Sequence, residues 1–324
     1  MSEILLSGLK SGEPIGFLAG IGLLRVCSHR EALGSIKLGW KQPAGAAGVL
    51  VTGAESEPDQ VIEEVLDHMR GRHQVPVYSG RPAAGITVGD GDWDDVKVDP
   101  ELFGALLRAT RPYVNPDDRE SADFLAALGS ELVAARSTSD IRPSALHMTS
   151  GNQKFLKLLR DLARSLDATD STCKEASCPP ADAFREALFG EWQYADQFSS
   201  LGYDPATEAI YALSDAAPAD AKPWSTRAAV WLAVEAIPLF PCFPVGGRLY
   251  TRGFDQSGTR FRWPVWNAPL SLSAIRTLLG LPALSAPELA PITLDSYGIS
   301  AVFEAERVTI GKGYGQFRPG IRVY

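Results

Sequence analysis

The first long apolar run of the chain, residues 15–26, follows Pro14 and predicts a buried helix. Three glycines inside the run, Gly16, Gly20 and Gly22, lower its intrinsic helix propensity. A helix that tolerates them gains more from packing than from propensity. We therefore expect this helix to pack closely against a flat surface.

Other periodicities predict a mixture of strands and helices. Polar and apolar residues alternate over residues 35–40, which predicts a strand, and residues 48–52 are its expected partner. Helical spacing of apolar residues predicts helices at residues 59–69, 101–108 and 121–136. From residue 245 onward, β-branched and aromatic residues with frequent glycines predict mostly strands.

These patterns together predict an α+β fold, with helical segments mixed with short antiparallel sheets and a β-rich C-terminal part. Breaks rich in polar residues, alanine or proline occur at residues 168–180, 214–223 and 281–291. We expect an acidic N-terminal α+β part at residues 1–170 and a C-terminal β-rich part with basic patches at residues 181–324. The boundary lies near residues 168–180, and one continuous domain is the alternative.

Composition narrows the class of protein. The chain has 324 residues, of which 45% are hydrophobic and 22% charged, so it is neither disordered, collagen-like nor a disulfide-stapled mini-protein. The net charge of -8 argues against a histone-like protein that binds nucleic acid over its whole surface, but it allows a local basic groove. Residues 242–324 carry a net charge of +4 and the rest carry -12. This asymmetry indicates that one end faces an anionic partner.

Cysteine usage and hydropathy predict a cytoplasmic location. No basic leader precedes the early apolar run, and no stretch reaches the eighteen or so apolar residues of a membrane helix. Four cysteines, at 27, 173, 178 and 242, form neither a disulfide framework nor a pair separated by two residues. We expect reduced thiols and no contact with a membrane.

The most informative local pattern lies at residues 150–166. Ser150 and Gln153 have the spacing of a capping box, which predicts that a helix starts there. Apolar residues then fall on one face, and Lys154, Lys157, Arg160 and Arg164 fall on the opposite face. Two interpretations follow: a solvated polar face, or a contact with phosphate near the free N–H groups of the first turn.

A second basic pattern alternates with aromatic residues. On a strand over residues 259–263, Arg260 and Arg262 share one face, and Phe261 and Trp263 share the other. Arg248 and Arg252 lie just before it. Such residues suit backbone contacts and base stacking on nucleic acid, and they equally suit an edge strand whose charges prevent aggregation.

A glycine-rich segment at residues 311–320 carries Lys312 and Arg318, and Arg322 follows in an expected strand. Glycines allow a backbone to approach a phosphodiester chain closely, but a plain hairpin turn has the same composition. The pattern of a phosphate-binding P-loop is absent.

Signatures of catalysis are scarce. The four histidines form no close pair, and neither a nucleophile elbow nor a dinucleotide-binding glycine motif occurs. The acidic run from Asp90 to Glu101 resembles a calcium loop, but Asp95 replaces its glycine and Pro100 interrupts it. We therefore predict no catalytic residue, metal site or cofactor. The residues that we expect to bind nucleic acid are Lys154, Lys157, Arg160, Arg164, Arg248, Arg252, Arg260, Arg262, Lys312, Arg318 and Arg322.

Several blocks of the chain, read in order, resemble one family. The blocks are residues 13–25, 34–40, 149–156, 187–194, 236–241 and 261–266. They resemble proteins of type I CRISPR–Cas loci of the I-U subtype, also called I-G. Within this subtype, they resemble the family that forms the large-subunit-like component or an extension of the helicase–nuclease. The blocks span roughly residues 10 to 270, so the resemblance covers most of the chain.

This resemblance implies a non-enzymatic subunit of an RNA-guided surveillance complex in antiviral defence. The expected partners are the other subunits of the complex, guide RNA, target DNA and the helicase–nuclease that the subunit helps to recruit. One alternative is a protein-only adaptor that bridges the complex to its nuclease through the acidic half. A weaker alternative is a metal-dependent nuclease that uses Asp90, Asp92 and Asp94.

Overall fold

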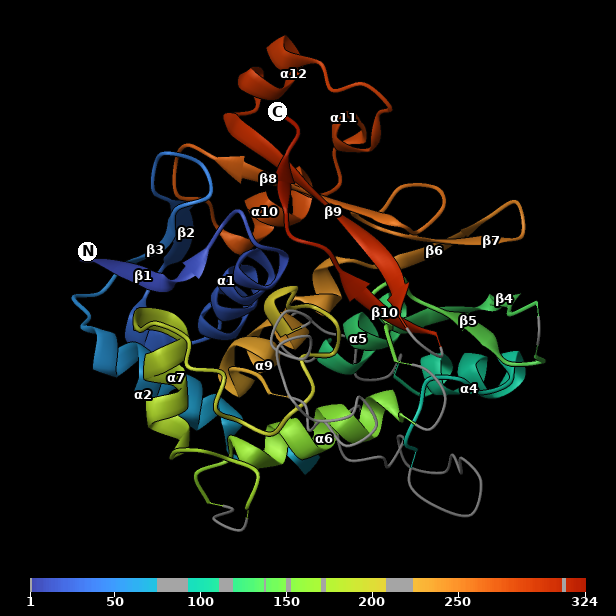
Figure 1. The fold of residues 1–324 in the computed structure, drawn as a ribbon, viewed down its shortest axis with the longest axis horizontal. Coiled ribbons are helices and arrows are strands. Elements are labelled where there is room, and N and C mark those ends of the chain that lie inside the picture. Colours follow the sequence, from blue (N-terminus) through green and yellow to red (C-terminus); the bar gives the residue numbers. More distant parts are fainter. Residues whose placement is uncertain are drawn as a thin grey trace.

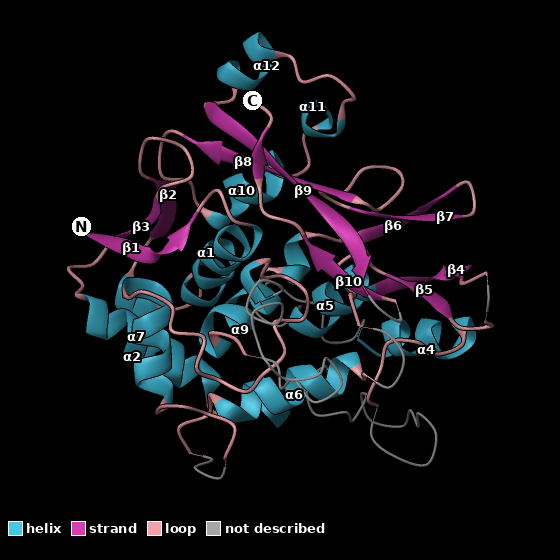
Figure 2. Ribbon diagram, viewed as in Figure 1, coloured by secondary structure: helices cyan, strands magenta, loops and turns pink. Residues whose placement is uncertain are grey.

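The computed structural model describes residues 2–74, 93–110, 119–136, 138–149, 153–169, 173–207, 224–310 and 313–324. These residues form an α+β structure, as the sequence predicts. Figure 1 shows most of the helices grouped in the centre and lower part of the molecule, with α11 and α12 at the top, and Figure 2 shows the short sheets above and beside the central group. None of the helices in these ranges is long and apolar enough to cross a lipid bilayer.

The helices and strands follow one another along the chain with these bounds. The helices are α1 (Pro14–Cys27), α2 (Pro58–Met69), α4 (Pro100–Thr110), α5 (Glu120–Leu128), α6 (Phe155–Ser165), α7 (Pro180–Phe189), α9 (Arg227–Glu235), α10 (Leu272–Leu278), α11 (Pro282–Ser285) and α12 (Pro291–Ser296). The strands are β1 (Ser2–Lys10), β2 (Ile36–Trp40), β3 (Ala47–Thr52), β4 (Gly129–Ala134), β5 (Ile141–Pro143), β6 (Cys242–Val245), β7 (Arg248–Thr251), β8 (Arg260–Trp266), β9 (Ile299–Ile310), β10 (Tyr314–Phe317) and β11 (Ile321–Arg322).

The N-terminal sheet has the antiparallel order β1-β3-β2. Leu38 of β2 pairs with Leu50 of β3, and both side chains are fully buried. The predicted partnership of residues 35–40 with residues 48–52 is therefore confirmed. The alternation reflects two different faces of the sheet: one face packs on α1, whereas Lys37, which points to the other face of β2, is exposed.

The C-terminal sheet is built around the long strand β9. It pairs with β8, β10 and β11, all antiparallel. Phe261 and Trp263 of β8 point into the core and are fully buried, whereas the intervening Arg262 is half-buried. The predicted alternation is confirmed. The β-branched and aromatic residues that are frequent from residue 245 onward predict this sheet. The same region also contains the short helices α10, α11 and α12.

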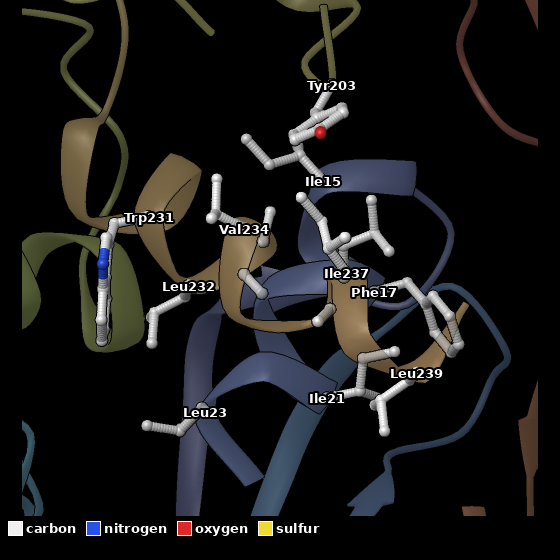
Figure 3. Close-up of a cluster of buried hydrophobic side chains, with 14 of the residues drawn as sticks. Ile15, Phe17, Ile21, Leu23, Tyr203, Trp231, Leu232, Val234, Ile237 and Leu239 are labelled. Carbon is white, nitrogen blue, oxygen red and sulfur yellow. The ribbon is translucent and has the colours of Figure 1, made fainter. Parts of the chain in front are cut away.

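The core of the molecule is the contact between α1 and α9. Every residue of both helices is buried. Figure 3 shows Leu23 of α1 on the same side as Leu232 of α9, and Ile21 of α1 beside Leu239, which follows α9. The contact joins residues more than two hundred positions apart, and the same hydrophobic core extends from β1 to β10.

Glycines in α1 make this close contact possible. A Cβ at Gly22 would lie 2.8 Å from the carbonyl carbon of Leu232 and closer still to its oxygen. A Cβ at Gly20 would lie 2.7 Å from the ring of Trp40 on β2. The predicted close packing is confirmed, and it involves a helix backbone as well as the sheet.

Two predicted helix boundaries are wrong. The helix expected at residues 121–136 ends at Leu128, because residues 129–134 form β4 and pair with β5. The helix expected to start at Ser150 begins at Phe155, with Lys154 as N-cap and no capping by a side chain. The four cysteines are free thiols, as the sequence predicts.

Candidate functional site

The basic side chains of α6 are largely paired. Arg160 is buried and forms an ion pair with Asp94, which corrects the prediction that it lies on a solvated face. Lys157 is exposed but pairs with Asp161 at 2.6 Å, and its backbone N–H donates to the Asp94 carbonyl. Lys154 and Arg164 are exposed. In the first turn of α6, protein groups therefore take the place that a phosphate would have under one of the two interpretations of the sequence.

The two arginines of β8 share one carboxylate. Nε of Arg262 lies 2.5 Å from Glu304 of β9, and Nη1 of Arg260 lies 3.8 Å from the same carboxylate. The side chain of Glu304 is 11% exposed, so this pair is a cross-strand contact with limited access to solvent. Figure 1 shows α6 along the lower edge of the molecule and β8 in its upper half, so the two elements that carry these cations lie apart.

Of the three cations predicted in and after the glycine-rich segment, the structure describes Arg318 and Arg322. Lys312 lies outside the described residues. Arg318 is exposed after β10, and Arg322 is exposed and donates to the carbonyls of Tyr324 and Ser300. The segment from Gly313 to Phe317 folds back on β9, which favours the hairpin interpretation of the glycine-rich segment.

The β6–β7 hairpin differs from these surfaces because its cations have no carboxylate partner within the described ranges. Arg248 is exposed on β7. Arg252, directly after β7, is half-buried, and burial lowers the pKa of its guanidinium. We call residues 242–252 the basic arm. Figure 1 shows this hairpin extending from the side of the molecule, beside β4 and β5.

The turn of the basic arm is formed by two glycines. Gly246 and Gly247 have φ of 57° and 72°, which is the left-handed conformation of a tight hairpin turn. Nothing lies within 4 Å of a Cβ built at either position. The tip therefore faces open space. The adjacent pair of glycines is a sequence signal for this hairpin.

Aromatic rings accompany the cations of the arm. Phe243 of β6 and Tyr250 of β7 stack with ring centroids 5.9 Å apart and an angle of 11°. Phe243 is 45% exposed, and Val245 is 54% exposed. An exposed ring beside an unpaired arginine can take a base on its face or an apolar partner residue.

A further arginine near the arm has no signal in the sequence. Arg276 of α10 lies close enough to Arg252 for the two charges to repel, which contributes to lowering the pKa of Arg276 after the larger effect of burial. Asp123 of α5 pairs with Arg276 at 3.5 Å and with Arg119 at 2.8 Å. One carboxylate thus serves two arginines beside the base of the arm, so this region keeps an excess of positive charge.

A buried ionic network joins four distant segments. Arg25 of α1 and Arg72 contact both Glu120 of α5 and Glu235 of α9, with Arg25 at 2.9 Å from Glu120 and Arg72 at 3.0 Å from Glu235. Burial opposes ionisation of Glu235, but the charges of Arg72 and Arg25 outweigh it and lower its pKa. Charges of both signs balance, which is what a buried site requires.

Two carboxylates of this network belong to the one cluster of possible metal ligands in the described part of the chain. His68, Glu120 and Glu235 place possible ligand atoms within 4.8 Å of one another. Burial lowers the pKa of His68 to about 4, so the ring is neutral at pH 7. A divalent cation would have to displace two guanidinium groups from the carboxylates. The group is therefore a structural network rather than a metal site.

The acidic run proposed for a nuclease lies partly outside the described residues, which exclude Asp90 and Asp92. Asp94 pairs with Arg160. Asp95 accepts a hydrogen bond from His147 at 3.0 Å, and this interaction lowers the pKa of Asp95 although burial alone would raise it. Both described carboxylates have protein partners, and both contacts attach the segment to the helical core.

Comparison with known proteins adds no family assignment. No model of a protein family matches the chain, and no curated protein matches it significantly.

Proposed function

We propose that this chain is a non-enzymatic, nucleic-acid-contacting subunit of a cytoplasmic type I CRISPR surveillance complex, and that the basic arm is its contact with nucleic acid. The proposal joins the family resemblance of the sequence to one structural observation. That observation is the exposed Arg248 at the tip of a hairpin, with no carboxylate partner among the described residues.

The chemistry of the arm suits a nucleic-acid backbone. Arg248 and Arg252 offer guanidinium groups that bind phosphate oxygens, and Arg276 adds charge at the base of the arm. The exposed face of Phe243 offers a surface on which an unpaired base can stack. Because β4 packs against both strands of the hairpin, it supports the arm on one side.

The acidic remainder of the chain supports local rather than global contact. Outside residues 242–324 the net charge is -12, so nucleic acid is repelled from most of the surface. The cations of α6 and β8 lie mainly against Asp94, Asp161 and Glu304. An arm that reaches outward meets a phosphate chain away from these acids.

A protein-only adaptor is the second candidate, and a specific observation favours it. Leu132 of β4 is 71% exposed and lies on the strand beside β6, where Val245 is also exposed. These apolar side chains form a surface that another subunit or the helicase–nuclease would cover. In that case the arm contacts protein.

The experiment is an electrophoretic shift of the full chain with duplex DNA, single-stranded DNA and guide-like RNA at about 50 and 300 mM salt. We compare the wild type with a double variant, Arg248→Ala with Arg252→Ala. For duplex DNA, loss of two phosphate contacts should reduce the slope of log affinity against log salt by about 1.8. Phe243→Ala should weaken binding to single strands by about tenfold, because one stacked base contributes 1–3 kcal/mol.

The matched control is Arg185→Ala. Arg185 is half-exposed but pairs with Asp59 and Asp182, so binding should not change. Binding that depends on Lys154 and Lys157 instead would reassign the contact to α6. No binding by the wild type at either salt, combined with co-purification of partner subunits that Leu132→Asp abolishes, would favour the adaptor.

A further inference from the structure

A cavity of about 770 Å³ opens between β1, the start of α1 and the segment that follows α7. Its volume lies within the range of small-molecule sites. Acidic and aromatic side chains line it together with apolar ones; those that matter for binding are Glu13, Phe189, Trp192, Tyr194, Asp204 and Pro319. None of these residues belongs to the basic arm, so the cavity is independent of the proposed contact with nucleic acid.

Asp204 is the unusual residue of the cavity. It is 3% exposed, and its Oδ1 accepts a hydrogen bond from the backbone N–H of Ala206 at 2.9 Å. Its Oδ2 has no hydrogen-bond partner at normal distance among the described residues, although the Tyr194 hydroxyl lies near enough to favour the ionised form and so opposes the effect of burial on the pKa of Asp204. A buried carboxylate oxygen without a donor is costly, and folded proteins rarely retain one without a functional reason. Burial raises the pKa of Asp204 to about 6, so the group is largely ionised at pH 7.5.

Further acidic groups face Asp204 from the neighbouring elements. Glu13 precedes α1, and burial together with the charge of Asp204 raises its pKa. Tyr194, after α7, interacts with Asp204, and burial and the nearby acids, Glu186 of α7 among them, raise the pKa of its hydroxyl. Lys10 of β1 and Glu191, after α7, also line the cavity, and both are exposed. At neutral pH the negative charge therefore exceeds the positive charge.

The backbone at Tyr194 is held in an unfavourable conformation. Its φ is 53°, in the left-handed region that bulky residues rarely adopt. Strain of this kind persists where the surroundings impose it, and it is concentrated at ligand sites. Here it places the Tyr194 ring beside Trp192, with centroids 6.3 Å apart.

We propose that this cavity binds a guanidinium group, with Oδ2 of Asp204 and the carboxylate of Glu13 as its acceptors and Trp192 beside its apolar stem. Guanidinium fits because it carries several donors in one plane and stacks on aromatic rings. Phe189 and Pro319 provide the apolar wall that an alkyl stem contacts. A hydrated metal ion would leave that wall unused.

The test is calorimetric titration of the full chain with butylguanidine and with its neutral analogue, butylurea. Butylguanidine should bind at pH 7.5 and butylurea should not. Asp204→Asn keeps the acceptor for Ala206 and removes the charge, so it should weaken binding at least about tenfold, as expected for loss of a charge-assisted hydrogen bond. Glu288→Gln, an exposed acid far along the chain on another segment, should bind as the wild type does.

Binding should also weaken as the pH falls from 7.5 to 5, because Asp204 and Glu13 then gain protons. Equal binding of butylurea, unchanged binding by Asp204→Asn, or no binding of butylguanidine would overturn the proposal. If Asp204→Asn fails to fold by circular dichroism, Glu13→Gln replaces it and should weaken binding in the same direction. Unchanged affinity in Glu13→Gln would then overturn it.

The source of the guanidinium group is decided by a second titrant. A short Gly- and Ser-flanked peptide with one arginine is compared with butylguanidine. Tighter binding of the peptide identifies an arginine side chain of a protein as the occupant, and equal or weaker binding identifies a free small molecule. Both results support a guanidinium site, and failure of both titrants contradicts it.

Discussion

Replacement of Gly22 by alanine tests the central claim about the core. The added Cβ would lie 2.8 Å from the carbonyl carbon of Leu232 and 3.2 Å from the backbone nitrogen of Ala236. Both are backbone atoms of a neighbouring buried segment and have no rotamer to change. Since carbon atoms pack at about 3.5–4.0 Å, α1 and α9 must separate by about 1 Å locally.

The expected cost follows from this separation. Overpacking of a core costs about 1–3 kcal/mol, and a clash with backbone belongs at the upper end. Alanine recovers at most about 1 kcal/mol through its better helix propensity. We expect the free energy of unfolding to fall by about 2 kcal/mol and, for a chain of this length, the Tm to fall by about 3 °C.

Thermal and urea unfolding followed by circular dichroism measure this loss. Gly280→Ala is the matched control, because a Cβ there would lie 3.4 Å from its nearest neighbour, at ordinary contact distance, and the site is exposed. The control should change the Tm little. A Gly22→Ala variant as stable as the wild type would refute the close approach of α1 and α9.

Three further predictions concern buried charge and the basic arm. Glu235→Ala removes one of the two carboxylates that contact both Arg25 and Arg72, so urea unfolding should show a loss of about 3–5 kcal/mol; a loss below about 1 kcal/mol would contradict a buried network. Because the pKa of Asp204 is raised from 3.8 to about 6 on folding, its contribution to stability is full below pH 4 and is lost as the pH rises through 6. Between pH 4 and pH 7, the free energy of unfolding of the wild type should therefore fall by up to about 3 kcal/mol relative to that of Asp204→Asn. Parallel pH profiles of the two proteins would exclude the pKa shift. Loss of the arm's arginines should lower the salt dependence of DNA binding without changing the Tm by more than about 2 °C.

Local patterns explain much of the secondary structure. The apolar run at residues 15–26 predicts α1, and alternation predicts β2, β3 and β8, because burial on one side imposes a period on the sequence. The prediction for residues 121–136 is wrong because its last third pairs with β5. Such pairing depends on a partner strand elsewhere in the chain.

The candidate sites depend more on tertiary structure. A basic face on α6 is visible in the sequence, but the partner of Arg160 is Asp94, 66 residues earlier. The arm could be anticipated from its paired glycines, whereas the charge of Arg276 beside it could not. A basic side chain is available to bind an anion only where no acidic side chain lies next to it. That depends on the distances in space between segments that are far apart in the sequence.

The sequence by itself determined the fold class, the strands and helices with strong periodicity, the free thiols and the unequal distribution of charge. Only the tertiary structure decided which charges are neutralised, that Arg25, Arg72, Glu120 and Glu235 meet in the core, and that Asp204 is left with an unpaired oxygen in a cavity. The reason is physical. Periodicity reports which face of an element is buried, whereas a site depends on which segments, distant in the chain, bury that face together.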